Sequence, residues 1–360
     1  ATPAPLPQAE FRRRVLGLAA ALTAVAGLAA VTQDDADARR KRHGRKRSHR
    51  PGRRKDNRKG KRKGQPPCLV CPEGCAFTSV QAAHDAAQDG DRLILCNGAY
   101  TEAVTIQKNV DLVTRAGHQV TLQGTGSGSV VTVQSGTTTT ISGRTAISGG
   151  TGTLVDGILR GGGILNYGNL TVTGESIVYA NSADEGGGIF NGSVASLAIT
   201  GQFTRVHLNT ATSDGAGIYN DGGSTLLIDD AQIHRNTAAG NGGGVFNGRS
   251  ATVTIQNNAQ IYDNTAAQGG GIYTTIGIDT NPGSVTLSDS SVTGNTATNA
   301  GGGIFNDGDV VTLKASTVFN NTATVTAGGI FNTEGGVVTL DARSAALDNQ
   351  PNNCVGTDAC

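Results

Sequence analysis

One phrase recurs along the second half of the chain, and its spacing constrains the fold more than any other feature. The phrase is a glycine-rich run, then Ile or Val, then an aromatic residue or Leu, then Asn in all but one copy. Its anchors are Ile164, Ile189, Ile218, Val245, Ile272, Ile304 and Ile330, separated by 25, 29, 27, 27, 32 and 26 residues. A nearly constant period of this size indicates stacked supersecondary units. We therefore expect the seven anchors to form one buried column.

Two further columns keep the same period. Alternating apolar pairs such as Leu170 and Val172 predict strands with one buried face. An apolar-x-x-Asn phrase ends at Asn181, Asn209, Asn236, Asn264, Asn295 and Asn321, with a further copy at Asn349. Each coil therefore supplies three short strands, and we expect its Asn amides to stack at about 4.8 Å per coil. The sequence predicts an all-β fold, a single-stranded right-handed parallel β-helix.

Composition and the start of the body agree with this prediction. Glycine accounts for 53 of 360 residues, and Trp and Met are absent, as expected for short strands joined by tight turns. Thr78 or Ser79 can cap a short helix in which Val80, Ala83 and Ala87 recur at helical spacing. Such a helix would cover the strand edges that the first coil otherwise exposes.

Two sets of residues resemble known families. The segment from Ser79 to Ala83, with Gly90-Asp91 and the segment from Gly98 to Glu102, resembles the helix and first strand of the pectin-lyase-like family. The combination of Gly-Gly-Gly-Ile with apolar-x-x-Asn is similar to the repeats of chlamydial-type polymorphic outer-membrane proteins. These resemblances imply the fold but not an activity, because β-helices of this type include adhesins, lyases, hydrolases and phage spikes.

The first 38 residues read as a targeting segment. Arg12 to Arg14 precede an apolar run from Val15 to Val31, and Ala36-Asp37-Ala38 matches a cleavage site. We expect bacterial export by the Sec or the Tat route, cleavage after Ala38 and a secreted or cell-surface protein. The alternative is a retained membrane anchor. The remaining predicted divisions are a basic linker at 39–66, the β-helix at 67–353 and a C-terminal cysteine tail at 354–360.

The formal net charge of +1 hides two opposed blocks. Residues 39–63 contain sixteen Lys or Arg against one acid, a net +15, whereas the body from Gln65 onward carries a net −13. The basic linker has no apolar periodicity, so we expect it to be disordered. It is either a solvated linker or a tether to cell-envelope polyanions, with non-specific nucleic-acid binding as a further outcome.

The six cysteines lie at the two ends of the body. An even count behind an export signal favours disulfides, and we predict the pairs Cys75–Cys96 and Cys354–Cys360. The alternative for the first group is a zinc site with four thiolates, from Cys68, Cys71, Cys75 and Cys96.

Candidate functional residues fall into two groups, and the sequence indicates no cofactor. Glu185 and Asp214 each precede the glycine run of successive coils, so they are the best candidates for a catalytic carboxylate pair or a calcium site; as turn residues they need have no such role. The residue after each apolar anchor of the Asn phrase forms an outward stripe: Tyr179, His207, His234, Tyr262, Thr293 and Phe319. With Arg235 beside it, this stripe is the candidate surface for binding a glycan or a partner, unless it is a casual surface stripe.

Three functions are consistent with these features. The first is a non-enzymatic surface, structural or adhesion module that binds glycans, the second a polysaccharide lyase or hydrolase, and the third an envelope protein that binds polyanions through its basic linker. Release of reducing sugars from a polysaccharide panel separates the second from the others.

The charge division makes a testable prediction about the basic linker. We expect deletion of 39–64 to abolish salt-sensitive retention on heparin or DNA, because sixteen cations in a short segment release many counterions. The melting temperature of the body should not change, since charges farther apart than about 8 Å are screened at physiological salt. Chromatography across a salt series and thermal unfolding test both parts. A body that melts much lower after the deletion would show that the linker belongs to the fold.

Overall fold

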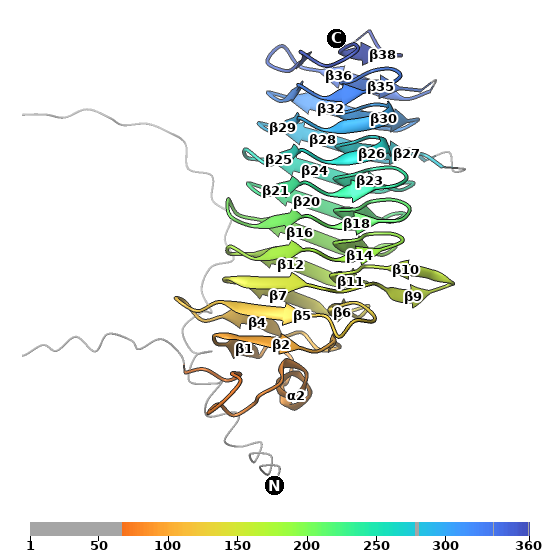
Figure 1. Ribbon diagram of the computed structural model, residues 1–360. Helices are drawn as coiled ribbons and strands as arrows, with labels where there is room; N and C mark the ends of the chain where they lie inside the picture. Colours follow the sequence, from red (N-terminus) through yellow and green to blue (C-terminus); the bar gives the residue numbers. More distant parts are fainter. Residues whose placement is uncertain (1–66, 278–280, 334, 359) are drawn as a thin grey trace, which may run out of the picture. The chain divides into compact units, whose positions relative to one another are not determined.

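The computed structural model describes residues 67–277, 281–333, 335–358 and 360, and they form a parallel β-solenoid (Figure 1). The predicted signal segment, 1–38, and the predicted basic linker, 39–66, lie outside the described residues. Three ten-stranded sheets, called sheets A, B and C, contribute to the successive coils, and a fourth, sheet D, has six strands. The predicted all-β class, with parallel strands and a short N-terminal helix, is therefore confirmed.

The strands follow one another in a fixed order around each coil. Sheet A contains β1 (Arg92–Leu95), β4 (Asp111–Thr114), β7 (Thr138–Ser142), β12 (Asn169–Thr173), β16 (Ser196–Thr200), β20 (Thr225–Asp229), β24 (Thr252–Gln256), β28 (Ser284–Ser288), β32 (Val310–Lys314) and β36 (Val337–Leu340). Sheet B contains β2 (Gly98–Thr101), β5 (Val120–Gln123), β8 (Thr145–Ser148), β13 (Ile177–Tyr179), β17 (Arg205–His207), β21 (Gln232–His234), β25 (Gln260–Tyr262), β29 (Ser291–Thr293), β33 (Thr317–Phe319) and β37 (Ala345–Leu347).

Sheets C and D complete the coil. Sheet C contains β3 (Val104–Ile106), β6 (Val131–Val133), β11 (Ile164–Asn166), β15 (Ile189–Asn191), β19 (Ile218–Asn220), β23 (Val245–Asn247), β27 (Ile272–Thr275), β31 (Ile304–Asp307), β35 (Ile330–Asn332) and β38 (Cys354–Val355). Sheet D contains β14 (Ser182–Ala183), β18 (Thr210–Ala211), β22 (Thr237–Ala238), β26 (Thr265–Gln268), β30 (Thr296–Ala300) and β34 (Thr322–Ala323). An antiparallel hairpin, β9 (Thr153–Val155) and β10 (Ile158–Arg160), projects from the stack (Figure 1).

The seven anchors of the repeated phrase form one column in sheet C. Parallel pairing aligns each anchor with the anchor of the next coil, as in Ile164 with Ile189 and Ile304 with Ile330. All seven side chains are fully buried. The predicted register is confirmed. The next residue of each copy points to the opposite face, where Phe190, Tyr219, Phe246, Tyr273, Phe305 and Phe331 stack with ring centroids 4.5–5.3 Å apart.

The Asn residues of the apolar-x-x-Asn phrase form a continuous hydrogen-bonded ladder. Asn209 shows the pattern: its Nδ2 donates to Asn236 Oδ1 at 3.0 Å and to the carbonyl of Val178 at 3.1 Å. Its Oδ1 accepts from both Nδ2 and the backbone nitrogen of Asn181 at 3.1 Å. The same bonds join Asn181, Asn209, Asn236, Asn264, Asn295, Asn321 and Asn349. Each buried amide thus forms hydrogen bonds with the coils on either side of it. The ladder therefore fixes the register between successive coils.

A second Asn ladder runs along sheet C and is interrupted at Thr274. Asn247 Nδ2 donates to Thr274 Oγ1 at 3.1 Å, and Thr274 in turn donates to the Asp309 carboxylate. Asp309 is fully buried and also accepts from the Gly283 nitrogen at 2.7 Å. Burial raises the pKa of Asp309. A hydroxyl and a carboxylate from the next coil therefore replace the missing amide.

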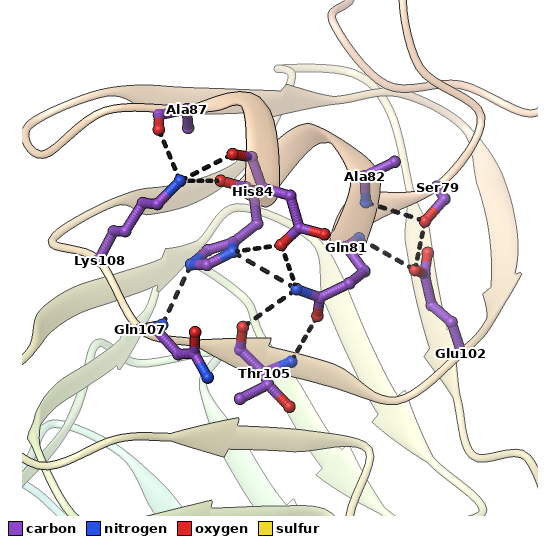
Figure 2. A network of polar contacts seen from close by, with 10 residues as sticks. Ser79, Gln81, Ala82, His84, Ala87, Glu102, Thr105, Gln107 and Lys108 are labelled. Atoms are coloured by element: carbon purple, nitrogen blue, oxygen red, sulfur yellow. Dashed lines mark hydrogen bonds and ion pairs between the residues drawn. The ribbon is translucent and has the colours of Figure 1, made fainter.

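The helix α2 (Val80–Ala86) closes the N-terminal end of the stack (Figure 1). Ser79 is its N-cap and accepts from the Ala82 nitrogen at 3.2 Å. The Glu102 carboxylate, which follows β2, accepts from Ser79 Oγ and the Val80 nitrogen, both at 2.7 Å. At the other end, Lys108 Nζ donates to the carbonyls of His84, Asp85 and Ala87 (Figure 2). Opposite charges thus satisfy the two ends of the helix, as the macrodipole favours.

Side chains of α2 also satisfy the exposed edge of strand β3. Gln81 Oε1 accepts from the Thr105 nitrogen at 2.7 Å, and the buried His84 accepts from the Gln107 nitrogen at 3.1 Å through Nε2 (Figure 2). These bonds replace the coil that would otherwise pair with β3. The helix therefore blocks the addition of another strand at this end, which an open edge would invite.

The disulfides correct one prediction and confirm another. Cys68 pairs with Cys96, and Cys71 pairs with Cys75. The predicted Cys75–Cys96 bond is therefore wrong: Cys75 lies in a turn that closes back on Cys71, while Cys68 lies beside the end of β1, where Leu69 and Val70 bond to the Ile94 carbonyl. Cys354 pairs with Cys360, as predicted. Cys354 also belongs to β38, which pairs with β35, so sheet C continues into the predicted tail at 354–360.

In the described part of the chain, no helix is long and apolar enough to cross a membrane.

The Asn ladder predicts a large stability difference between two asparagines. We expect Asn209→Ala to lower the free energy of unfolding by about 2–4 kcal/mol, because it removes the acceptor of the buried Asn181 backbone nitrogen and the side-chain donors to Val178 and Asn236. Asn169→Ala is the control, since Asn169 is exposed and makes only one long side-chain bond, 3.4 Å to Thr138. Urea unfolding followed by circular dichroism measures both. Equal losses in the two variants would contradict a structural role for the ladder.

Candidate binding site

The outward face of sheet B carries four aromatic side chains that we call the ring ladder: Tyr179, His207, His234 and Tyr262. Each is the last residue of its strand, in β13, β17, β21 and β25, and the parallel register places each beside the next. The residue before each ring is fully buried. Because side chains alternate along a strand, the rings point away from the core. The structure thus brings the predicted binding residues together.

The rings stack almost parallel. The centroids of Tyr179 and His207 are 5.7 Å apart, those of His207 and His234 are 4.9 Å apart, and those of His234 and Tyr262 are 4.5 Å apart. The interplanar angles are 13°, 2° and 3°. The coil spacing of about 4.8 Å imposes this stacking on identical positions of successive coils. Thr293 ends the ladder, so Phe319, the next aromatic residue of the column, stands apart from it.

The two histidines of the ladder are held in an environment that disfavours their charged form. His234 is 8 % exposed, and neither of its ring nitrogens has a hydrogen-bond partner in the described residues. Burial, followed by the nearby charges of His207, Arg235 and Arg205, lowers the pKa of His234 to about 4. Burial and the same two arginines also lower the pKa of His207. The two histidines are therefore uncharged at neutral pH, which favours close stacking.

Two arginines flank the ladder in different ways. Arg205 precedes His207 by two positions on β17, so it lies on the same face, and its Nε is buried without a partner among the described residues. Arg235 follows β21 at a backbone φ of 54°, and its guanidinium is 63 % exposed, 3.9 Å from Asp263. Arg235, a predicted binding residue, therefore lies at the corner beside the ladder, whereas Arg205 lies on the face itself.

A shallow groove continues this face toward the N-terminal end of sheet B. Its floor contains Ala146 of β8 and Ile177 of β13, which pair directly. Arg205 borders it on one side, and an Arg144–Glu175 ion pair at 3.5 Å borders it on another. Phe203 also lines the groove and is 53 % exposed, which is unusual for so large an apolar side chain. The groove and the ring ladder share one surface.

The candidate carboxylate pair is arranged differently from a catalytic dyad. Glu185 and Asp214 do precede successive glycine runs, and the Gly186 nitrogen bonds to the Asp214 carbonyl at 3.1 Å. However, the Glu185 carboxylate pairs with Arg160 at 2.8 Å, with both side chains largely buried, and the Arg160 guanidinium also lies over the Phe190 ring. Asp214 Oδ1 accepts from the Asn241 nitrogen at 2.6 Å. The two carboxylates therefore bind different partners, and each holds a neighbouring segment in place.

Comparison with protein-family models, with curated proteins and with solved structures found no match to this chain. The fold and the ring ladder define the class on their own: a parallel β-solenoid with asparagine ladders and one aromatic outward face.

Sequence reasoning found the ring ladder but missed Arg205, Arg144 and Phe203. The period of two along a strand was the available signal, because the residue two before each ring shares its face. Applied to β17, this period gives Arg205 before His207, and Phe203 two positions earlier. The groove itself had no such signal, because its lining residues come from several different coils.

The lowered pKa of His234 predicts how stability depends on pH. A histidine in an unfolded chain has a pKa of about 6.5, so between that value and about 4 the unfolded state binds a proton that the folded state does not. Stability is therefore lost as the pH falls through this window. Between about pH 7 and 4.5 the free energy of unfolding of the native chain should therefore fall. We expect it to fall by about 2 kcal/mol less in His234→Phe, which keeps a stacked ring but has no imidazole to protonate.

Urea unfolding at a series of pH values measures this difference. Tyr262→Phe is the matched control, because it changes the same ladder without removing a proton acceptor and should keep the native slope. A His234→Phe variant as acid-sensitive as the native chain would place the responsible group elsewhere.

Proposed function

We propose that this protein is exported to the cell surface or secreted, and that its solenoid is a non-enzymatic adhesion or glycan-binding module. The observation that carries the proposal is the ring ladder, four stacked rings on one outward face beside a groove. Ligand sites combine apolar and aromatic surface with a few placed polar groups. This face offers both kinds of group on a rigid sheet, so little conformational entropy is lost when a ligand binds.

The stacking itself indicates where a sugar ring would bind. The inner rings, His207 and His234, have both faces covered by their neighbours and offer only their edges. Tyr179 has a ring partner on one side alone, toward His207, and the preceding coil has the small Ser148 at this column. Ile177, two positions before Tyr179 on the same face of β13, lines the groove. A sugar with an apolar face would stack there while its hydroxyls reach the ring edges and Arg205.

The alternative function, a polysaccharide lyase or hydrolase, has less support. Glycoside hydrolysis uses two carboxyl groups that flank the scissile bond. The best candidates for this role, Glu185 and Asp214, are engaged in an ion pair and in a backbone contact. Assays for reducing ends and for unsaturated uronides with a polysaccharide panel would detect an enzyme. Release of either product would replace the binding proposal.

Two further parts of the proposal rest on the sequence. We propose that the repeats are related to those of chlamydial-type polymorphic outer-membrane proteins within the pectin-lyase-like fold, on the strength of the Gly-Gly-Gly-Ile and apolar-x-x-Asn phrases. We also propose that residues 39–63 attach the module to cell-envelope polyanions, because their charge of +15 suits non-specific binding of such polymers.

A substitution at Tyr179 tests the binding proposal. We expect the full chain to bind a subset of a glycan array, and Tyr179→Ala to weaken that binding about fivefold or more, since a lost stacking contact is worth roughly 1 kcal/mol or above. Phe319→Ala is the control: it removes an aromatic residue from the same column of sheet B but outside the ladder. Equal binding by the native chain and both variants would reject this face as the site.

A further inference from the structure

Three buried side-chain nitrogens on the ring-ladder face are not satisfied by the described residues. Arg205 Nε and both ring nitrogens of His234 are buried and have no hydrogen-bond partner in the part of the chain that the structure describes. Buried polar atoms in native proteins nearly always have a partner, and each exception calls for an explanation such as a ligand. Three such atoms occur on the same face, from residues on adjacent strands. Their clustering indicates a place for a group that the protein does not itself supply.

The charges around this face are unbalanced in one direction. Arg205 lies on the face of β17, and Arg235 lies at the end of β21. Two of the arginines here have an acidic partner: Arg235 pairs with Asp263, after β25, at 3.9 Å, and Arg144 pairs with Glu175, before β13, at 3.5 Å. Arg205 has no ion pair among the described residues, so its positive charge is the unbalanced one. The other titratable groups of this face are the phenols of Tyr179 and Tyr262, and burial raises the pKa of Tyr262.

The sign of the unbalanced charge selects the ligand. A metal ion is disfavoured, because Arg205 and Arg235 would repel it. A carboxylate or sulfate group is favoured, because a guanidinium with a free Nε–H is a strong donor to an oxyanion. The groove beside Arg205 has an apolar floor and the exposed Phe203 at its border, and so fits a ring-shaped body that carries such a group.

We propose that this face binds an anionic group of a glycan beside Arg205 and His207, and that His207 takes up a proton from solvent as the anion binds. The proposal rests on the proposed glycan-binding function and adds the charge of the ligand and its coupling to pH. His207 is the proton acceptor because it is partly exposed, whereas the nitrogens of His234 are covered. In the free protein, burial and then the charges of Arg205 and Arg235 oppose protonation of His207. An anion bound beside these arginines offsets their part of that opposition, so affinity rises as the pH falls.

Titration calorimetry with the full chain tests the proposal. The probes are a hyaluronan hexasaccharide, which carries only carboxylates, a chondroitin sulfate hexasaccharide, which adds sulfates, and an uncharged chitin hexasaccharide. Titrations run from about pH 7.5 to 5, the range in which histidine commonly titrates. Buffers of different ionisation enthalpy report proton uptake. We expect the acidic probes to bind about tenfold more tightly at the lower pH, a coupling of ordinary size between two sites.

Five variants locate the effect. Arg205→Gln should weaken the acidic probes about tenfold at every pH, whereas Arg205→Lys should retain part of the affinity. His207→Asn should remove the pH dependence and the proton uptake. His234→Phe keeps a stacked ring but removes the two unpaired nitrogens, so it should weaken the acidic probes and still show the proton uptake of His207. Arg92→Gln, on sheet A, should behave as the native chain. The basic segment 39–63 also attracts anions, but every variant contains it, so the differences between variants report the face alone. Thermal unfolding confirms that each variant is folded.

The outcomes separate this inference from the proposed function. Proton uptake that persists in His207→Asn, or unchanged affinity in Arg205→Gln, overturns the inference. Preferential binding of the chitin probe, sensitive to Tyr179→Ala and independent of pH, supports the proposed function and overturns the inference. Binding of anionic phospholipid vesicles with no binding of any hexasaccharide overturns both. If hyaluronan and chondroitin sulfate gain the same affinity at the lower pH, the site binds carboxylates. If chondroitin sulfate gains more, the site binds sulfates.

Discussion

The in-register hydrogen bonding of one coil to the next is the constraint on which the rest of this structure depends. Parallel pairing alone leaves the register of short strands weakly specified, because strands of three residues offer few bonds. The buried asparagines remove that freedom. Each amide bonds to the same amide of the coils above and below, and a slip of one residue would bury these groups without partners. The asparagine ladder therefore specifies the register of the coils, and the apolar core supplies most of the stability.

The candidate binding surface follows from this register. Positions that recur once per coil become columns, and a column of outward aromatic residues becomes a stack. The same rule stacks phenylalanines and tyrosines beside the glycine corners, where they are largely buried, and stacks the ring ladder on sheet B, where it is partly exposed. The difference between a packing column and a candidate binding surface is therefore only which side of the coil the column occupies.

Both ends of the described body are secured by interactions that the repeats do not provide. The N-terminal end is closed by α2, whose Gln81 and His84 side chains bond to the edge of β3. The Cys68–Cys96 disulfide ties the segment before this helix to the first strand. Near the C-terminal end, the Cys354–Cys360 disulfide holds the segment that follows β38. A solenoid needs such devices because its terminal coils have no neighbour to pair with.

The sequence by itself determined the fold, the register of the anchors and the membership of the ring ladder, because each follows from a period that is visible in one dimension. Only the tertiary structure decided what lies between columns. It assigned Cys96 to Cys68, engaged Glu185 with Arg160, and placed Arg205 beside a groove, without an ion pair among the described residues. These outcomes depend on side-chain direction and on contacts between residues about 25 or more positions apart, in turns whose lengths vary. A repeat period fixes which coil a residue belongs to, but not the neighbour that its side chain meets.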